Sequence, residues 1–311
     1  MKLNIVVTGA SGFIGAATVK ELLARNHNVA ALVRCDSNSY RLDHCDGLKK
    51  ITYLQFCDSK TVVELMAFEP DVFIHCGWRG VSGKDRNELF QLRDNLQMSL
   101  QSVELAAAAG CYKWIGLGSQ AEYGNQNQRL DETAATLPTT LYGKAKLATG
   151  IACLALAETL GISAAWLRVF STYGPGDAPN WLLQYALREF EAGRSPRLTT
   201  CTQLWDYLHV SDAARAISIV AENKGAEGTF NLGSGTARSL RYWVDLLRES
   251  IGSKIEPEYG IIPFRPDQVM HLEADISRII AKTGWKPMMS PEEGIATLLP
   301  TNRISSFGKF I

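Results

Sequence analysis

The chain has 311 residues, and 46% of them are hydrophobic, enough for a sizeable core in one large or two unequal lobes. Lysine plus arginine and aspartate plus glutamate number 32 each, so no net basic charge recommends a nucleic-acid partner. The seven cysteines show no CxxC pair or metal-ligand spacing, and no apolar stretch reaches membrane-spanning length. We therefore expect a cytoplasmic protein with reduced thiols, no metal and no membrane contact.

The first strand and turn carry a dinucleotide-binding pattern. The apolar sequence LNIVV is followed at once by TGASGFIG, in which Gly9, Gly12 and Gly15 lie three residues apart. The first glycine permits a tight turn, the second lets the backbone approach phosphates, and the third lets a helix pack close to the strand. An apolar-periodic helix follows over 13–23, and its N-terminus would face a pyrophosphate. The pattern predicts a nucleotide cofactor.

Short apolar strands and helices then alternate, which predicts an α/β fold with a parallel, doubly wound sheet covered on both faces. The expected strands are 29–33, 51–56, 72–75, 113–117, 162–169 and 229–232, and the expected helices are 61–67, 86–109, 141–160, 181–192 and 240–250. We infer a dinucleotide-binding lobe of residues 1–170 plus about 206–235, and a smaller α/β substrate lobe of residues 171–205 plus 236–311. A substrate cleft is expected at the carboxyl ends of the strands.

Tyr142 and Lys146 lie four residues apart at the start of a predicted helix, so both side chains fall on one face. A free tyrosine has a pKa of about 10, and a neighbouring ammonium and a nicotinamide cation would both lower it. The pair can therefore act as an acid or a base. Ser119 ends the preceding strand, where the sites of such sheets form.

Together these residues resemble the extended branch of the short-chain dehydrogenase/reductase family, the nucleotide-sugar epimerases, dehydratases and reductases also grouped as the NAD-dependent epimerase/dehydratase family. TGASGFIG is similar to the family's cofactor loop, and YGKAK to its YxxxK pair. AEYG, RVFSTYGPG, WDYLHVSDAARA and FNLGSGT are similar to later markers. The resemblance implies a Rossmann-type fold with a nucleotide-sugar-binding second lobe, and catalytic roles for Ser119, Tyr142 and Lys146.

The resemblance also implies binding residues. Those expected at the cofactor are Gly9, Ser11, Gly12, Phe13, Ile14, Gly15, Asp58 at the adenine, Asn95 near the nicotinamide, Tyr142 and Lys146. Those expected at the substrate are Trp78, Gln120, Ser171 and Arg265, the last at a diphosphate. The alternatives are a packed indole at Trp78, a loop carboxylate at Asp58, a helix-face amide at Asn95 and a surface guanidinium at Arg265.

Two positions depart from the family pattern. The Asp-Glu pair that dehydratases carry after the catalytic hydroxyl is replaced by Gln120 and Ala121, which disfavours dehydration. Glu122, one place further on, leaves a shifted acid open. The asparagine of the family's RxxN segment is Ser171, which puts that substrate contact in doubt.

The end of the second strand bears on the cofactor. NAD-binding members usually carry an acid there that holds the ribose diol, whereas this chain has Arg34. A guanidinium suits a 2′-phosphate, so we expect NADP(H), with NAD(H) possible if the strand extends to Asp36. Reduced NADP implies a net reduction.

We therefore expect NAD(P)H-dependent reduction of a 4-keto-6-deoxyhexose linked to dTDP, CDP or GDP. A nucleotide-sugar epimerase that recycles NAD and a non-catalytic, cofactor-sensing binding protein are the alternatives. The helices expected at 86–109 and 141–160 carry broad faces of alanine, leucine and methionine. Such helices pair into a four-helix bundle in the resembling family, so a homodimer is expected, although burial against the sheet explains part of the same pattern.

Overall fold

The computed structural model describes residues 1–53, 56, 58–81 and 83–299 of the chain. Some parts of the expected elements lie outside the described residues. They are part of the strand expected over 51–56, the residue Cys57, and the last twelve residues of the expected second lobe. The other cysteines carry free thiols. Within the described chain, no helix combines the length and the apolar character that a membrane crossing requires.

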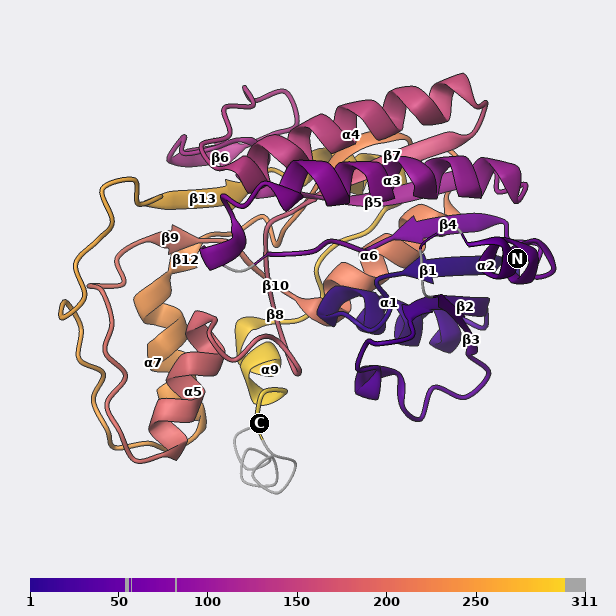
Figure 1. The fold of residues 1–311 in the computed structure, drawn as a ribbon. Coiled ribbons are helices and arrows are strands. Elements are labelled where there is room, and N and C mark those ends of the chain that lie inside the picture. The colour runs from indigo at the N-terminus through magenta and orange to yellow at the C-terminus, as the bar shows by residue number, and fades with distance from the viewer. Residues whose placement is uncertain (54–55, 57, 82, 300–311) are drawn as a thin grey trace.

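A parallel sheet forms the centre of the larger lobe (Figure 1). The described part of the chain gives it seven strands in the order β11-β7-β5-β4-β1-β2-β3. Their bounds are β1 (Asn4–Thr8), β2 (Asn28–Arg34), β3 (Lys49–Tyr53), β4 (Val72–His75), β5 (Lys113–Ser119), β7 (Ser163–Val169) and β11 (Gly228–Leu232). Because the order reverses beside β1, the carboxyl ends of β1 and β4 flank a topological switch point, where ligands of such sheets bind. The predicted Rossmann-type, doubly wound fold is confirmed.

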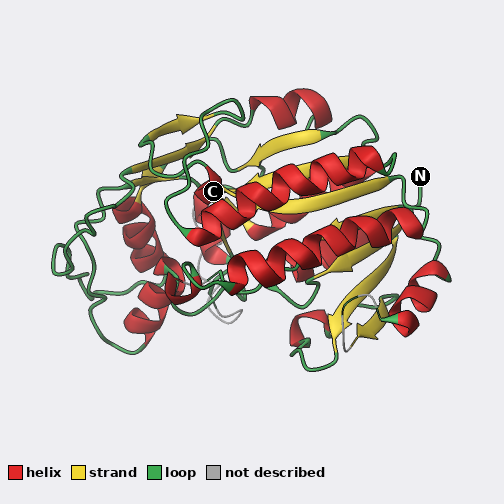
Figure 2. Ribbon diagram, turned by 45° about the horizontal axis from the view of Figure 1, so that its top comes forward, coloured by secondary structure: helices red, strands yellow, loops and turns green. Residues whose placement is uncertain are grey.

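Helices cover both faces of this sheet. The helices α3 (Phe90–Ala108) and α4 (Leu141–Thr159) run side by side across one face (Figure 2), and α1 (Phe13–Ala24) packs with α6 (Val210–Glu222) on the other. The short helix α2 (Ser59–Met66) contacts β3. Side chains of β1 alternate between two cores, since Ile5 and Val7 belong to one and Val6 to the other. Because the strand is buried on both faces, its residues Ile5, Val6 and Val7 are all apolar.

The helix α3 begins at Phe90, four residues later than expected. The residues before it hold the start of α4, because the carbonyl of Arg86 accepts a hydrogen bond from the backbone N–H of Tyr142 at 2.8 Å. The side chain of Asn87 accepts another from the N–H of Leu141 at 3.0 Å. These backbone and side-chain groups therefore join two segments instead of extending the helix.

The second lobe is assembled from short elements. In the described chain its sheets are β12 (Arg238–Ser239), β9 (Leu204–Trp205), β13 (His271–Ala274) and β6 (Gln128–Leu130), with β8 (Ser171–Tyr173) paired to β10 (Tyr207–His209). Its helices are α5 (Leu182–Glu191), α7 (Leu240–Ser250), α8 (Ser277–Thr283) and α9 (Pro291–Ala296). The strand β6 precedes α4 in the chain, yet pairs with β13. The weakly periodic region 251–287 contains β13 and α8, which are too short to show periodicity.

Candidate active site

The glycine-rich turn between β1 and α1 has a geometry that fits a dinucleotide. Gly9 has a φ of +62°, and a Cβ there would lie 2.6 Å from the carbonyl carbon of Cys76. A Cβ on Gly15 would overlap the carbonyl oxygen of Gly9. Gly12 is the N-cap of α1, and no side chain of the described residues caps that helix. A helix N-terminus without a side-chain cap, beside a turn whose glycines carry no side chains, fits a pyrophosphate. Ser11 lies in the same turn, and Phe13 and Ile14 begin α1.

The carboxyl end of β2 presents a guanidinium. Arg34 is the last residue of the strand, its side chain is 59% exposed, and it forms an ion pair of 3.4 Å with Asp36 beyond the strand end. Arg41, which the sequence analysis did not single out, donates hydrogen bonds to the carbonyls of Ser11 at 3.3 Å and Gly176 at 2.8 Å. Its Nε is buried without a partner among the described residues. The rim of the cofactor turn therefore offers two cationic side chains to an anion.

Ser119 and Tyr142 come together where β5 ends and α4 begins. Both residues are buried, each being only 7% exposed, and the Ser119 hydroxyl acts to lower the pKa of Tyr142. Gly143 makes this approach possible, because a Cβ at that position would overlap the carbonyl oxygen of Ala121 in the turn after Ser119. The small residue that follows the tyrosine thus brings the helix against the catalytic strand.

Tyr142 is held as a phenol. Burial raises its pKa, while the hydrogen bond from Ser119 and the charge of Arg86 act in the opposite direction. The Arg86 guanidinium lies 5.0 Å from the centroid of the Tyr142 ring. Desolvation outweighs these two effects, and the lowered pKa expected from Lys146 together with a bound nicotinamide cation stays a prediction. At neutral pH Tyr142 therefore carries the proton that a general acid donates.

Lys146 is buried on the same helix face, with 4% of the residue exposed. Its Nζ donates to the carbonyl of Leu117 at 2.6 Å and lies 3.6 Å from the centroid of the Trp78 indole. Burial lowers the pKa of Lys146 to about 7. The Trp78 ring also meets the Tyr142 ring edge-on, with centroids 6.0 Å apart. Trp78 therefore contacts both members of the predicted tyrosine–lysine pair.

Two buried amides on α3 fix the segment that carries Trp78. Gln91 accepts a hydrogen bond from Trp78 Nε1 at 2.9 Å and donates to the carbonyl of Asp85 at 3.0 Å. Asn95 accepts from the N–H of Arg79 at 2.8 Å and donates to its carbonyl at 3.0 Å. The role of Asn95 near the nicotinamide stays a prediction. Gln91 was missed, although a glutamine one helical turn before Asn95, on the helix face toward the sheet, was a usable signal.

The remaining predicted residues lie on separate elements. Asp58 caps α2 by accepting from the N–H of Thr61 at 2.8 Å. Ser171 begins β8 and accepts from Trp205 Nε1 at 2.6 Å. Gln120 opens the 3-10 turn after Ser119, and Arg265 is exposed on the loop between α7 and β13. Their contacts with the cofactor and substrate stay predictions.

Glu122 does not provide the shifted acid that the sequence left open. It is fully buried, and its Oε1 accepts from the N–H of Ser119 at 2.8 Å and from Trp166 Nε1 at 3.0 Å. Its Oε2 accepts from Arg168 Nε at 2.7 Å. Because both oxygens are occupied inside the protein, Glu122 is not available to protonate a leaving hydroxyl. Dehydration is therefore disfavoured by the geometry as well as by Gln120 and Ala121.

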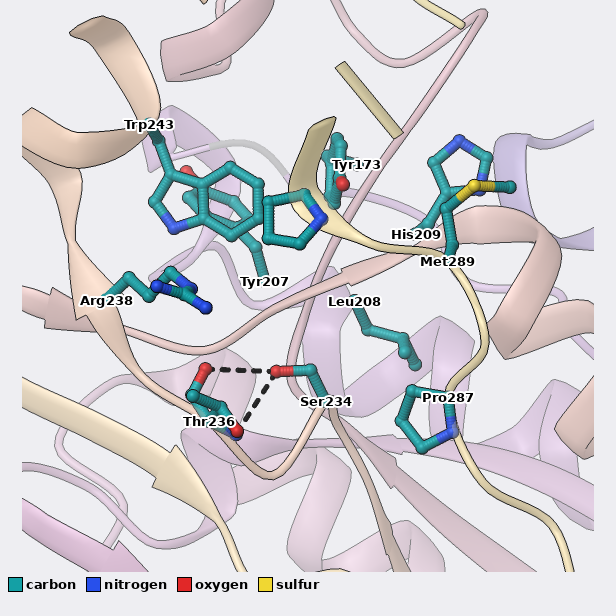
Figure 3. Close-up of a pocket in the computed structure, with 11 residues that line it drawn as sticks. Tyr173, Tyr207, Leu208, His209, Ser234, Thr236, Arg238, Trp243, Pro287 and Met289 are labelled. Atoms are coloured by element: carbon teal, nitrogen blue, oxygen red, sulfur yellow. Dashed lines mark hydrogen bonds between the residues drawn. The ribbon is translucent and has the colours of Figure 1, made fainter. Parts of the chain in front are cut away.

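A cavity of about 170 Å³ lies in the second lobe (Figure 3). Its walls include the rings of Tyr173, Tyr207 and Trp243 and the Arg238 side chain. Ser234 supports the wall by donating to the carbonyl of Thr236 and accepting from its N–H. None of the predicted catalytic residues lines this cavity.

Comparison with known proteins places these features in a wider group. Residues 5–233 match the model of the NAD dependent epimerase/dehydratase family. The chain is 24% identical to a dTDP-4-dehydro-6-deoxyglucose reductase of Escherichia coli, with 97% of this chain and 98% of the relative covered. It is 26% identical to a dTDP-6-deoxy-L-talose 4-dehydrogenase (NAD(P)(+)) of Kitasatospora kifunensis, with 95% and 94% covered.

A solved structure shows the same fold. The UDP-glucose-4-epimerase of Stenotrophomonas maltophila, with bound NAD and formylated UDP-arabinopyranose, superposes with a TM-score of 0.86 at 22% identity. The match covers 98% of this chain and 99% of that one. The resemblance drawn from the glycine turn and the serine, tyrosine and lysine is therefore confirmed at the level of family and fold.

Proposed function

Because the chain belongs to the NAD dependent epimerase/dehydratase family, whose members modify nucleotide sugars, we propose that it reduces a nucleotide-linked 4-keto-6-deoxyhexose with NADPH. The observation that carries this proposal is the burial of Tyr142 beside Ser119, which raises the pKa of the tyrosine. A ketone that gains a hydride needs a proton at its oxygen, and a phenol held in its acid form is suited to supply it. An oxidation of a hydroxyl would first require the phenolate.

The chain's own residues divide the work of such a reduction. When bound, NADPH supplies the hydride. The glycine turn and the N-terminus of α1 would hold its pyrophosphate, and the Lys146 ammonium its nicotinamide ribose. The Ser119 hydroxyl would donate a hydrogen bond to the substrate oxygen as negative charge develops there, and the Tyr142 hydroxyl would give that oxygen its proton.

The rim residues support NADP over NAD. Arg34 ends β2 at the position where a carboxylate would otherwise bind the ribose diol, and Asp36 lies beyond the strand. A guanidinium pairs well with a phosphate, and Arg41 adds a second one at the same turn. The relative from Kitasatospora kifunensis is named for both NAD and NADP, while the solved neighbour holds NAD.

The decisive test uses dTDP-, CDP- and GDP-linked 4-keto-6-deoxyhexoses, each with NADPH and with NADH. Absorbance of the reduced cofactor should fall with at least one sugar, and faster with NADPH. Tyr142→Phe is the control, since it should bind the cofactor and leave the absorbance steady. A panel on which the wild type binds cofactor but reduces nothing would contradict the proposal and favour a cofactor-sensing role.

A nucleotide-sugar epimerase is the second candidate, because the solved neighbour described above is one and shares the fold over nearly the whole chain. The same serine, tyrosine and lysine would then first oxidise the sugar and return the hydride to its other face. This candidate requires cofactor that remains bound through purification and sugar conversion without net loss of NADPH. The two activities are therefore separated by the stoichiometry of cofactor consumed to sugar converted.

A homodimer through α3 and α4 is part of the proposal. These helices lie side by side and expose apolar residues such as Leu92 and Ile151, the latter 63% exposed. Pairing across a two-fold axis would bury them in a four-helix bundle. Sedimentation should give a dimer that Ile151→Lys dissociates, with Lys144→Ala as an exposed control on the same helix. A wild-type monomer would contradict this arrangement.

A further inference from the structure

A buried carboxylate holds the turn that carries the catalytic serine. Glu122 lies in the 3-10 turn Gln120–Glu122, directly after β5. The Ser119 side chain accepts from the backbone N–H of Ala121, and the Glu122 side chain accepts in return from the N–H of Ser119. This reciprocal capping box fixes the backbone on both sides of the serine hydroxyl.

The surrounding residues leave a site shaped for that carboxylate. Gly118 gives it room, because a Cβ there would lie 2.5 Å from Glu122 Oε1. Trp166 donates its indole N–H to the same oxygen and stacks on Trp114, with centroids 6.3 Å apart. With the bond from Arg168, the Glu122 carboxylate therefore accepts three hydrogen bonds. It occupies a space that a side chain at position 118 would fill.

The buried ion pair between Glu122 and Arg168 is not explained by a contribution to the stability of the fold. The side chains of Glu122 and Arg168 are 0% and 9% exposed, and desolvation offsets much of the attraction in such a buried pair. An apolar pair of similar volume would hold the fold as well. Arg168 also donates to the hydroxyl of Tyr123 at 3.0 Å, which donates to Asn231 Oδ1 at 2.6 Å. The network thus runs from the serine turn to the end of β11.

The negative charge of Glu122 acts on the tyrosine–lysine pair. Burial lowers the pKa of Lys146, and Glu122 is the largest group that works against this. Burial raises the pKa of Tyr142, and Glu122 raises it further. Arg168 binds the other oxygen of the carboxylate, Oε2, whereas Oε1 accepts from the N–H of Ser119. The titratable and charged groups that bear on the pair from the elements packed around it are His75, Cys76, Arg86, Glu122 and Cys153.

We infer that Glu122 is a positioning residue for the reduction: it fixes the Ser119 hydroxyl through the serine backbone and holds a buried negative charge behind the serine turn. The inference rests on the proposed function. Glu122 itself does not touch the substrate or cofactor. It acts through the three residues that do.

The substitution Glu122→Gln tests the charge while keeping the size and one acceptor oxygen. Without the negative charge, both Tyr142 and Lys146 lose their protons at lower pH. The alkaline limb of kcat/KM against pH should therefore move down by about one pH unit, and kcat at neutral pH should fall about tenfold with cofactor KM nearly unchanged. The matched control is Glu132→Gln, since Glu132 accepts from the N–H of Asn231 at 2.7 Å in the same network but does not contact Ser119. Its pH profile should stay with the wild type.

A second variant and a second readout keep the test decisive if the unpaired Arg168 impairs folding. Glu122→Gln combined with Arg168→Gln removes both charges of the pair. Ionisation of Tyr142, followed by tyrosinate absorbance against a Tyr142→Phe background, should occur at lower pH in either variant. This readout needs no turnover, so it decides the inference even if no keto sugar is reduced and the proposed function fails. Unmoved pH profiles and tyrosine ionisation, with only a lower melting temperature, would overturn it.

Discussion

The predicted catalytic residues and the predicted selectivity residues lie in opposite surroundings. Ser119, Tyr142 and Lys146 are buried, whereas Arg34 at the end of β2 and Arg265 on the loop before β13 are exposed. The buried group is already in place, while long exposed side chains must lose rotamer freedom when they bind a ligand. We therefore expect the buried residues to determine the chemistry and the exposed residues to determine which sugar and cofactor are chosen. Substitutions of the buried residues should therefore lower kcat, whereas substitutions of the exposed residues should change ligand selectivity.

Tyr142→Phe should have the largest effect on activity. The loss of the proton donor should lower kcat by about 10²- to 10⁴-fold. Cofactor binding, measured by fluorescence titration, should be nearly unchanged because the phenyl ring still packs against Trp78. Full turnover of Tyr142→Phe with cofactor bound would show that the buried tyrosine is not the proton donor.

Lys146→Met should change stability in a pH-dependent way. The pKa of Lys146 is lowered to about 7 by burial, against 10.5 for an ordinary lysine, so the folded state disfavours the ammonium. The resulting cost is full below the lowered pKa and shrinks as pH rises toward the unfolded value, where the lysine is neutral in both states. Lys146→Met should therefore raise the free energy of unfolding by a few kcal/mol below about pH 7 and by progressively less at higher pH.

Thermal melts over a pH series measure this effect, and Lys144→Met, which alters an exposed lysine of the same helix, should leave the melting temperature unchanged at every pH. A stabilisation of equal size across the series would show that Lys146 is not held against its charge. Activity should fall in the same variant, because the group that would bind the ribose is gone.

Gly143→Ala tests whether the close packing of α4 against the turn after Ser119 is needed for activity. The added methyl group would overlap the carbonyl oxygen of Ala121, so α4 has to move away from the serine turn. A displacement of this kind should lower kcat by about 10²-fold while circular dichroism stays native. Lys144→Ala, one residue along and exposed, is the control. Wild-type turnover in Gly143→Ala would mean that the Ser119–Tyr142 distance tolerates the shift.

Arg34→Glu addresses the rim and should have the smallest effect. Exchange of the guanidinium for a carboxylate should move the ratio of kcat/KM for NADPH over NADH toward NADH by about tenfold, the equivalent of one charge-assisted hydrogen bond. The kcat with saturating cofactor should hardly change, since Arg34 is remote in the chain from the catalytic residues. An unaltered ratio would place the selectivity elsewhere, with Arg41 the next residue to exchange.

The larger lobe could be predicted from the sequence because its central strands are apolar runs and helices of several turns follow β1, β4 and β5. The strand Val72–His75 has the predicted bounds, and β5 extends only two residues further, to Ser119. The family motifs fall on the turns and strand ends of this lobe. Local pattern and global fold agree there, so a reading by periodicity succeeds.

The second lobe and the surroundings of the catalytic pair could not be predicted in the same way. Its strands, such as Leu204–Trp205, are too short for periodicity, and their partners are remote in sequence. The indole of Trp78 on the Lys146 ammonium and the position of Glu122 behind Ser119 are tertiary contacts without a local signal. Motifs indicated which residues matter, but only the packing shows that burial controls their protonation.

The pairing of β6 with β13 joins segments about 140 residues apart, because Leu130 lies opposite Ala274. A chain shortened before residue 271 would leave that strand without its neighbour and uncover apolar surface beside the serine turn. Excision of the first lobe as an independent module should therefore give insoluble material, and the full protein should melt in a single cooperative transition. An exchange of substrate selectivity between two relatives therefore has to replace Gln128–Leu130 together with the C-terminal half.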